Sequence, residues 1–492
     1  MPRPTHLLLS GLQSSSHLIR PPVVSRLRAF VCLESLSLLE EKLVKFRKTI
    51  GYGSGLWLAL VLFCVSTAAG QGPAPETAPP MSYSLQTPVP MKDQGRHAAS
   101  PSPLQELVQE VERSNPEIAA ALHTWQAATN VPRQASALPD TQVTIQQFSV
   151  GSPRPFAGFS NSDFAYVGVG ASQDLPYPGK RRLRSDVAER EADSIRAQSD
   201  GVRRQAIETL KLVYFQLAYL QQTLPVLERN DQLLSQIQQA VESRYRVGQG
   251  NQQDVLKAQL QHTKILREIA MHHQEEEQLQ AQLKQVLSRA QSSPDIVTEP
   301  LSPTALKDSD SDLLNRVRDQ NPSVRSRSEM VRRQESQVEL SHKEFRPDFN
   351  VSYTYEHTGD KFRDYYMASF GIRLPNRGRQ SAALAEAVQN EERAKRELQA
   401  EVQRVLSEVE QQYVLVRRSE DQLKIYTEGL IPQSETAFQA GMAAYQSNRQ
   451  DFGSLLSSFQ DVLNSNLEYQ RELVEHESAL ARLERLTGVS LP

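Results

Sequence analysis

One stretch of this chain occurs twice: Leu175-Pro176-Tyr177-Pro178-Gly179-Lys180 returns, with changes, as Leu374-Pro375-Asn376-Arg377-Gly378-Arg379. Both stretches follow a segment of alternating apolar and polar residues, and both precede a long charged segment with a helical pattern. Matches that recur in the same order along a chain are typical of an internally duplicated fold. Each copy is therefore predicted to hold a strand hairpin between helices.

Two further matches lie upstream of that stretch in each copy. Asn115-Pro116-Glu117-Ile118 returns as Asn321-Pro322-Ser323-Val324, and Ala137-Leu138-Pro139-Asp140 returns as Phe345-Arg346-Pro347-Asp348. The first match is expected to break or begin a helix, and the second to introduce a strand. Together the matches predict a first repeat over residues 103–300 and a second over residues 301–488.

The predicted strands carry apolar residues on one face only. The first pair is expected near residues 141–150 and 164–175, and the second pair has the clearer alternation. A soluble sandwich would show the same alternation, but neither pair has neighbouring strands in the sequence that could cover its apolar face. Aromatic-rich strands of about ten residues match the tilted span of a bilayer, so lipid is the expected cover. The predicted lipid-facing residues are Phe349, Val351, Tyr353, Tyr355, Phe370, Ile372 and Leu374.

Each hairpin precedes an exceptionally long helical pattern, over residues 181–244 and 380–444, and only Pro225 and Pro432 interrupt the two patterns. Each proline is expected to bend or break its helix. A turn follows, spanning residues 245–256 in the first copy and a shorter stretch in the second. The returning helices carry a stripe with the seven-residue period of coiled coils. In the second copy this stripe is predicted to consist of Phe452, Leu455, Phe459, Val462, Asn466, Tyr469, Leu473, His476, Leu480 and Leu483.

The N-terminal region is expected to be removed in part. Residues 1–70 are interpreted as an extension followed by a signal peptide, because the apolar stretch Leu56–Val65 lies between basic and small residues. The true start is predicted near Leu43 or Val44, and residues 71–102 are expected to form a flexible lead-in. The only cysteines, Cys32 and Cys64, precede the predicted cleavage site. A lipid-modified Cys64 is the alternative, although Phe63 stands where a small residue is wanted.

Composition argues against several classes of function. The formal net charge is only -3 and no basic stripe is present, so no nucleic-acid binding is expected. No apolar run of about 20 residues is long enough for a membrane-spanning helix. The pair His272-His273 is interpreted as part of a solvated helix surface, because adjacent residues on a helix point in different directions. No nucleophile grouping, zinc spacing or phosphate loop is present, so no enzyme activity, cofactor or metal site is predicted.

The order of these features resembles the outer-membrane efflux protein (TolC) family. The resemblance rests on the duplicated Asn-Pro starts, the paired hairpins, the turn Tyr245-x-x-Gly248-x5-Asp254-Val255-Leu256, and the ending Leu483-Glu484-Arg485-Leu486-Thr487-Gly488. It covers about residues 103–488. The short second turn resembles the heavy-metal efflux branch (CusC/CzcC-like).

The resemblance implies a mixed α and β fold. A homotrimer with four strands per chain would close a transmembrane β-barrel, continued by a long α-helical coiled-coil tunnel in the periplasm. The protein would be a passive exit duct in the outer membrane, coupled through a periplasmic adaptor (membrane fusion) protein to an inner-membrane pump. Iris-like movement of the tip helices would open it. The substrate stays open among metal ions, drugs and polypeptides.

The resemblance also assigns roles to the two tip turns. The adaptor-docking residues would be Tyr245, Gly248, Asp254, Val255, Leu256, Tyr445, Arg449, Asp451 and Phe452. Asp451 would also line the tunnel constriction, where Ser454 stands in place of a second acidic residue. Helix capping is the alternative role for Asp254 and Asp451. The alternative function for the whole chain is a soluble periplasmic coiled-coil scaffold whose hairpins form a small sheet.

Overall fold

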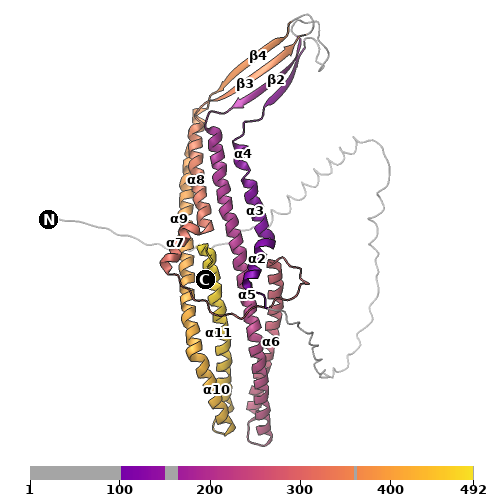
Figure 1. Cartoon of the computed structure of the whole chain (residues 1–492). Helices are drawn as coiled ribbons and strands as arrows, with labels where there is room; N and C mark the ends of the chain where they lie inside the picture. Colours follow the sequence, from indigo (N-terminus) through magenta and orange to yellow (C-terminus); the bar gives the residue numbers. More distant parts are fainter. Residues whose placement is uncertain (1–100, 150–164, 359–362, 491–492) are drawn as a thin grey trace, which may run out of the picture. The chain divides into compact units, whose positions relative to one another are not determined.

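The computed structural model describes residues 101–149, 165–358 and 363–490. The predicted extension, the signal peptide and nearly all of the lead-in lie outside the described residues. Within the described part, a small sheet lies at one end of a set of long helices, and two helical hairpin tips lie at the other end (Figure 1).

Both copies contain N-terminal helices, a strand hairpin and two long helical arms in the same order, as the predicted duplication requires. The first copy consists of α2 (Leu104–Ser114), α3 (Pro116–Ala128), α4 (Val131–Ala135), β1 (Gln142–Phe148), β2 (Tyr166–Leu175), α5 (Lys180–Arg246) and α6 (Gln252–Val286). The second copy consists of α7 (Asp310–Gln320), α8 (Pro322–Lys343), β3 (Asp348–His357), β4 (Tyr365–Arg373), α9 (Arg377–Ile425), the π-helix η1 (Tyr426–Leu430), α10 (Ile431–Gln446) and α11 (Phe452–Thr487). The boundary between residues 300 and 301 stays a prediction.

The two Asn-Pro pairs perform the same task in both copies. Asn115 is the N-cap of α3, and its side-chain oxygen accepts hydrogen bonds from the backbone of the first turn. Its amide also donates to the carbonyl of Val286, at the end of α6. Asn321 caps α8 in the same way and donates to the carbonyl of Leu486, near the end of α11, at 2.7 Å. Each asparagine therefore ties the start of one helix to the last turn of the returning helix.

The two hairpins form one antiparallel sheet in the order β1-β2-β3-β4. The hairpins share one register relative to the repeated motifs that flank them. Matching Asp140 with Asp348, and Leu175 with Leu374, places the pair Gln142–Ser172 on the pair Asn350–Gly371. Both of these pairs are present in the sheet. The duplication therefore extends to the pairing of individual residues.

A buried lysine joins the first copy to the second at the base of the sheet. Lys180 is 1% exposed, and its ammonium group lies 2.9 Å from an Asp348 carboxylate oxygen and 3.0 Å from a Glu344 carboxylate oxygen. It also donates to the carbonyl of Arg346 at 3.0 Å. The backbone N–H of Tyr177 donates to the same Asp348 side chain. The repeated Gly-Lys and Pro-Asp motifs thus meet each other across the two copies.

The long helices differ between the copies at their prolines. Helix α5 runs through Pro225 without interruption for 67 residues, a length of about 100 Å. In the second copy the π-helix η1 precedes α10, which has Pro432 in its first turn. The run from Lys180 to Arg246 corresponds to the run from Arg379 to Gln446, which is one residue longer. A π-helical turn accommodates one extra residue without ending the helix, so η1 absorbs this insertion.

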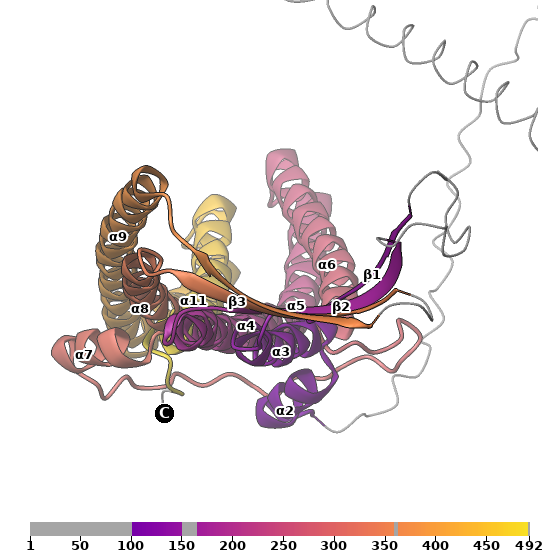
Figure 2. The ribbon, with the colours of Figure 1, turned by 90° about the horizontal axis from the view of Figure 1, so that it is seen from above.

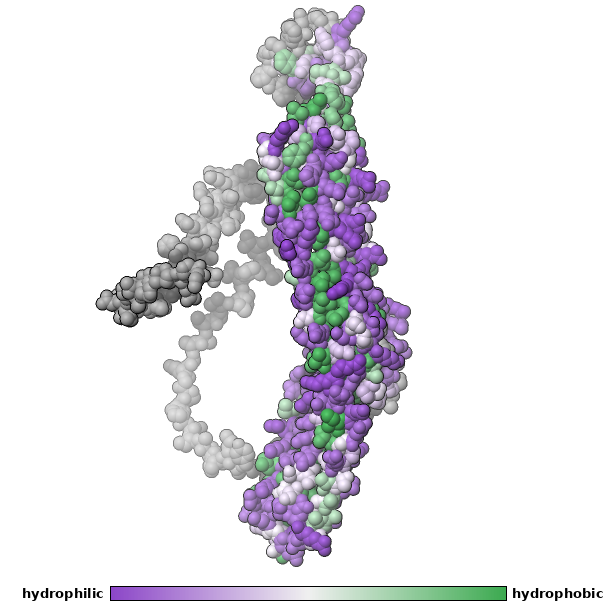
Figure 3. Space-filling view, turned by 90° about the vertical axis from the view of Figure 1, so that its left-hand side faces the viewer, coloured by the Kyte–Doolittle hydropathy of each residue, from purple (hydrophilic) through white to green (hydrophobic). Residues whose placement is uncertain are grey.

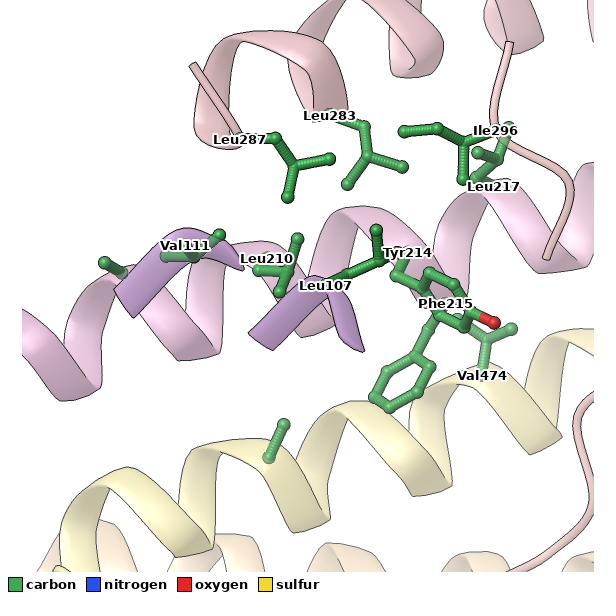
Figure 4. Close-up of a cluster of buried hydrophobic side chains, with 12 residues drawn as sticks. Leu107, Val111, Leu210, Tyr214, Phe215, Leu217, Leu283, Leu287, Ile296 and Val474 are labelled. Carbon is green, nitrogen blue, oxygen red and sulfur yellow. The ribbon is translucent and has the colours of Figure 1, made fainter. Parts of the chain in front are cut away.

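The core is divided into three clusters along the helices. The first lies where α2 packs on α5 and α6, with Leu107 and Val111 against Leu210 and Leu283 (Figure 4). The second joins the two tips, and the third packs α7 and α9 against α11. Segments that are far apart in the sequence therefore share each cluster.

Two details of the predicted helices are wrong. In the middle of α11 the buried residues are Leu463 and Leu467, whereas the predicted Val462 and Asn466 are only half-buried, so the stripe is one residue off there. Nearer the end of α11 the stripe is confirmed, because Leu473, His476, Leu480 and Leu483 are buried. The second tip turn is not shorter than the first, because residues 247–251 and 447–451 separate the helices equally in the two copies. The basis for assigning the heavy-metal branch is thereby lost.

Replacement of Asn321 by alanine should lower the free energy of unfolding by about 2 kcal/mol, because one side chain supplies both the cap and the bond to Leu486. The matched control is Asn376→Ala, which removes an exposed cap of α9 with a single backbone acceptor contact and should cost about 1 kcal/mol or less. Urea unfolding of the detergent-extracted protein, followed by circular dichroism, measures both. Equal losses in the two variants would contradict a clamping role for Asn321.

Candidate functional site

The four-stranded sheet has one apolar face that nothing covers within the described residues. The registers bring Phe349 opposite Ile372, Val351 opposite Phe370, and Val169 opposite Tyr355, all on one face. Large side chains on this face are widely exposed, for example Ile145 at 68% and Phe370 at 65%. Exposed apolar patches of this extent mark a surface that meets lipid or another protein. The opposite face carries mostly polar residues.

The predicted lipid-facing residues lie on this face of the strands, except that Leu374 directly follows the end of β4. Five of them are exposed, and the rings of Phe349 and Tyr355 are half-buried against Phe370 and Tyr366, with centroids 5.7 and 5.3 Å apart. The first hairpin adds residues that the sequence reasoning did not single out: Val143, Ile145 and Val169. Their alternation with Gln142, Thr144 and Gln146 was the signal that could have identified them.

Strands β1 and β4 form the two edges of the sheet, and each has a neighbour on one side only among the described residues. An edge strand presents a row of unpaired backbone N–H and C=O groups. In lipid each unpaired group costs several kcal/mol, so an open edge beside an apolar face demands another strand.

The two tips are built from the same turn. Gly248 has a φ of 75° and Asn448 a φ of 58°. In each turn the next residue donates back to the helix end: Gln249 to the carbonyl of Arg244, and Arg449 to that of Ala444. These bonds form a Schellman motif, which needs a residue that tolerates the left-handed region. Asn448 takes the place that Gly248 has in the first turn.

The caps of the returning helices correct one prediction. Asn251, not Asp254, caps α6 through its side chain, and Asp254 lies within the first turn. Asp451 caps α11 by accepting from the backbone N–H of Ser454 at 3.1 Å and from its hydroxyl at 2.6 Å. The hydrogen bonds from Ser454 lower the pKa of the exposed Asp451 carboxyl below its ordinary value. Asp451 therefore carries its charge at neutral pH, whatever further role it has.

An arginine links the two tips of the chain. Arg244, in the last turn of α5, donates to the carbonyl of Tyr445 at 2.9 Å and to the Asn448 side chain. Its guanidinium group also lies 4.6 Å from the centroid of the Tyr445 ring. The sequence reasoning missed Arg244, since its partners lie in the other copy and no local pattern announces the contact.

The predicted docking residues divide into three groups by their exposure. Tyr245, Gly248, Leu256, Arg449 and Asp451 are exposed, whereas Asp254 and Val255 are half-buried. The side chains of Tyr445 and Phe452 are 8% and 1% exposed, and their rings pack edge to face within the cluster that joins the tips. These two rings therefore support the turn from inside and do not present themselves to a partner.

A cleft of about 880 Å³ lies between α2, α5, α11 and the segment 299–304. Glu477 borders it and is only 9% exposed. Its carboxylate accepts from the backbone N–H of Thr304 at 2.8 Å, while the carbonyl of Thr304 accepts from Nε2 of His476 at 2.7 Å. Burial raises the pKa of Glu477, and the bonds from Thr304 offset only part of that effect.

Among residues 101–149, 165–358 and 363–490, no three His, Cys, Asp or Glu side chains are grouped as metal ligands. Nδ1 of His272 lies 3.0 Å from the carbonyl of Glu268 on its own helix, and His273 lies 3.9 Å from Glu276. In the same described part, no helix combines the length and apolar character needed to cross a bilayer.

A comparison with protein-family models matches residues 107–289 and 313–489 to the outer membrane efflux protein family. The two matched segments fall in the two copies. A search of curated proteins finds no match.

Several solved structures have a similar fold. VceC, an outer membrane protein from Vibrio cholerae, is 17% identical with a TM-score of 0.68, and the match covers 79% of this chain and 96% of VceC. CusC is 15% identical with a TM-score of 0.68, over 78% of this chain and 92% of CusC. The open state of the MtrE outer membrane channel from Neisseria gonorrhoeae is 16% identical with a TM-score of 0.67, over 79% of this chain and 89% of MtrE. At these identities the likeness concerns the fold.

Replacement of Arg244 by alanine should loosen the contact between the tips, because it removes two hydrogen bonds and the contact with the Tyr445 ring. A loss of about 1–2 kcal/mol would speed amide hydrogen exchange in residues 447–451 roughly tenfold. The control is Arg246→Ala, whose side chain bonds only Ser243 of its own helix within the described residues. Exchange that is equally fast in both variants would show that Arg244 does not hold the tips together.

Replacement of Glu477 by glutamine should change how stability depends on pH. The pKa of Glu477 is higher in the folded than in the unfolded protein. The wild-type protein therefore gains stability as the pH falls from the folded pKa to the unfolded pKa, and it loses this stability as the pH rises again. The variant lacks this term, so its stability relative to wild type should be highest near pH 8 and decline toward pH 5. Thermal unfolding across that range measures the difference. Exposed Glu435→Gln is the control and should give a flat difference.

Proposed function

The chain belongs to the outer membrane efflux protein family, and we propose that it acts as the exit duct of a tripartite efflux system. In this role it is a passive channel with no chemistry of its own, and it spans the outer membrane as a homotrimer. A periplasmic adaptor connects its tips to an inner-membrane pump, which supplies the energy. The proposal rests on family membership and on one observation above all, the apolar sheet face with two open edges.

Three copies of a four-stranded sheet supply the strands of one closed barrel. Closure pairs both edge strands of every chain, so that their backbone N–H and C=O groups form hydrogen bonds that lipid cannot provide. The face with Ile145, Tyr353 and Phe370 then meets lipid, and the face with Thr144, Ser352 and Ser369 lines the lumen. This arrangement of apolar outside and polar inside is typical of channels built from strands.

The long helices extend the same duct into the periplasm. Helix α5 alone is about 100 Å long, and most of its surface is charged or polar. Figure 3 shows the face that α8 and α9 present, where hydrophobic side chains form a broken band between hydrophilic ones. Exposed apolar residues on α9, such as Val388 and Val414, call for neighbouring helices. A ring of copies supplies those neighbours and leaves a water-filled tunnel at the centre.

The tips are the expected docking site for the adaptor. Their exposed side chains include Tyr245, Val247, Leu256 and Arg449, which offer apolar and basic contacts at the end of the duct. Docking at this site can act on the contact between the tips, because Arg244 and Tyr445 lie directly beneath the turns. Opening of the tips on docking is the step that would let substrate pass.

Asp451 is proposed to ring the constriction of the duct. Copies of one carboxylate at a narrow ring favour cations and hinder anions. Its capping bonds with Ser454 hold the carboxylate at the first turn of α11 in every copy. The position equivalent to Asp254 is Ser454 in the second copy, so only one acidic residue of the second tip contributes.

The substrate class stays open. Equal tip turns remove the reason to favour metal ions, and no group of three metal-ligating side chains occurs within the described residues. In a wide duct the selection of substrate belongs mainly to the pump. The soluble scaffold gains no support from the structure, since it leaves the apolar sheet face in water.

Single-channel recording of the purified protein in a planar bilayer tests the proposal. We expect small, cation-selective openings, and Asp451→Asn should reduce the selectivity by several fold while keeping the helix cap, because asparagine caps as well as aspartate. The control is Asp254→Asn, which removes the same charge from the other tip and should leave selectivity nearly unchanged.

The possible outcomes separate the two parts of the proposal. Channels whose selectivity ignores Asp451→Asn would keep the duct and return Asp451 to capping alone. Folded protein that neither inserts nor conducts, and that is released into the soluble periplasm on cell fractionation, would favour the scaffold and overturn the duct.

A further inference from the structure

We infer that the contact between the two copies inside one chain is a template for the contact between chains. On this inference, β4 pairs with β1 of a second copy of this chain in one defined register, and Arg379 forms an ion pair with Asp140 of that second copy. The inference rests on the proposed trimer, and it adds the register and the residues that make the trimer close.

The contact between the two internal copies has two parts that can recur between chains. The last strand of the first copy, β2, pairs with the first strand of the second copy, β3, from Val167–His357 to Leu175–Phe349. Below the strands, Lys180 forms ion pairs with Asp348 and Glu344. A chain that ends its sheet with β4 and begins it with β1 can repeat this contact with its neighbour.

The repeated motifs define which residues of the two internal copies correspond to each other. Leu374 corresponds to Leu175, and Asp140 corresponds to Asp348. The two hairpins independently validate this correspondence, because it maps the residue pairs of β1–β2 onto those of β3–β4 without a shift. Applied to the β2–β3 pairing, it maps Ser172–Ser352 onto Gly371–Thr144 and Gln173–Val351 onto Ile372–Val143.

The register obtained in this way also aligns the apolar faces of β4 and β1, which were not used to derive it. It places Ile372 opposite Val143 and Phe370 opposite Ile145, and all four of these residues lie on the exposed apolar face of the sheet. A slip of one residue would turn every side chain of the added strand to the wrong face. The apolar face of one copy therefore continues into that of the next without a break.

The basic and acidic residues of the Lys180–Asp348 contact also have counterparts at the junction between chains. Arg379 takes the place of Lys180, and Asp140 takes the place of Asp348. Both side chains are exposed, and neither forms an ion pair with another residue in the described part of the chain. Ser136 takes the place of Glu344 by the same correspondence, so the contact between chains keeps one carboxylate of the two.

The helices next to the sheet offer matching surfaces. Figure 2 shows α8 and α9 near one end of the sheet and β1 at the opposite end, with α3 beneath the sheet between them. The two ends of the sheet thus carry different surfaces, as a head-to-tail ring requires. Within the chain α5 packs against α8, so α9 should pack against α3 and α4 of the neighbour. The first copy leaves Leu122, Val131 and Leu138 exposed there, and α9 presents Val388 from a segment rich in alanine.

Disulfide cross-linking tests the register in the full chain. In a background with Cys32→Ser and Cys64→Ser, the double variant Thr144→Cys with Gly371→Cys should form a covalent trimer on mild oxidation. An added Cβ at Gly371 makes only ordinary contacts, so the variant should fold. Within one chain β2 and β3 separate the two positions by three strand spacings, about 14 Å, which is too far for a disulfide.

The control moves one cysteine by two residues on the same face, as Thr144→Cys with Ser369→Cys, and should cross-link at least several fold less because diagonal partners lie about 7–8 Å apart. A native trimer in which the control cross-links and the test pair does not would overturn the register while leaving the proposed duct intact. Protein that is monomeric in native gels and fails to insert would instead overturn the duct itself.

A charge exchange tests the ion pair. Arg379→Asp alone should lower the temperature at which the trimer dissociates in detergent, and adding Asp140→Arg should restore most of the loss. The same exchange leaves Lys180 and its partners untouched, so the fold of each chain provides an internal reference through its circular dichroism. A double variant no more stable than the single one would refute the pairing of Arg379 with Asp140.

Discussion

A strand edge cannot stay open beside lipid, and this constraint accounts for most of the structure. The sheet has an apolar face that is exposed and two edges with a neighbour on one side only. Burying the apolar face in a bilayer is favourable only when the backbone groups of both edges are paired. One chain with four strands cannot satisfy this condition, and in the proposed trimer the neighbouring chains supply the missing strands. Duplication makes this possible, because each copy already contains both halves of the contact.

Contacts between the two internal copies also connect the sheet to the helices. Lys180 is the first residue of α5 and contacts Asp348, the first residue of β3, so the sheet and the helices are joined at a point shared by both copies. At the other end of α6 and α11, Asn115 and Asn321 tie each returning helix to the start of an N-terminal one. Helices α5, α6 and α11 are thus held at defined points, and between these points they depend on packing with their neighbours.

The sequence predicted the fold where a pattern is local or repeated. The strands and the alternation of their faces follow from short-range rules. The predicted stripe on α11 is one residue off between Phe459 and Leu473, because the neighbours of a helix in space decide which of its residues are buried. Asp254 was taken for a cap that Asn251 provides, since two suitable residues stood close together. Contacts between the copies, such as Arg244 with Tyr445, left no local trace in the sequence.

The differences between the copies indicate where the assembly can move. Arg244 joins the two tips of one chain, but the equivalent position in the second copy is Ala444, which has no side chain long enough to reach a neighbouring tip. The ion-pair contact below the sheet is also weaker between chains than within a chain, because Ser136 stands at the position that corresponds to Glu344. In the proposed trimer the tips are therefore held more firmly within a chain than between chains. An opening movement should separate the tips of neighbouring chains first, while each chain keeps its own pair together.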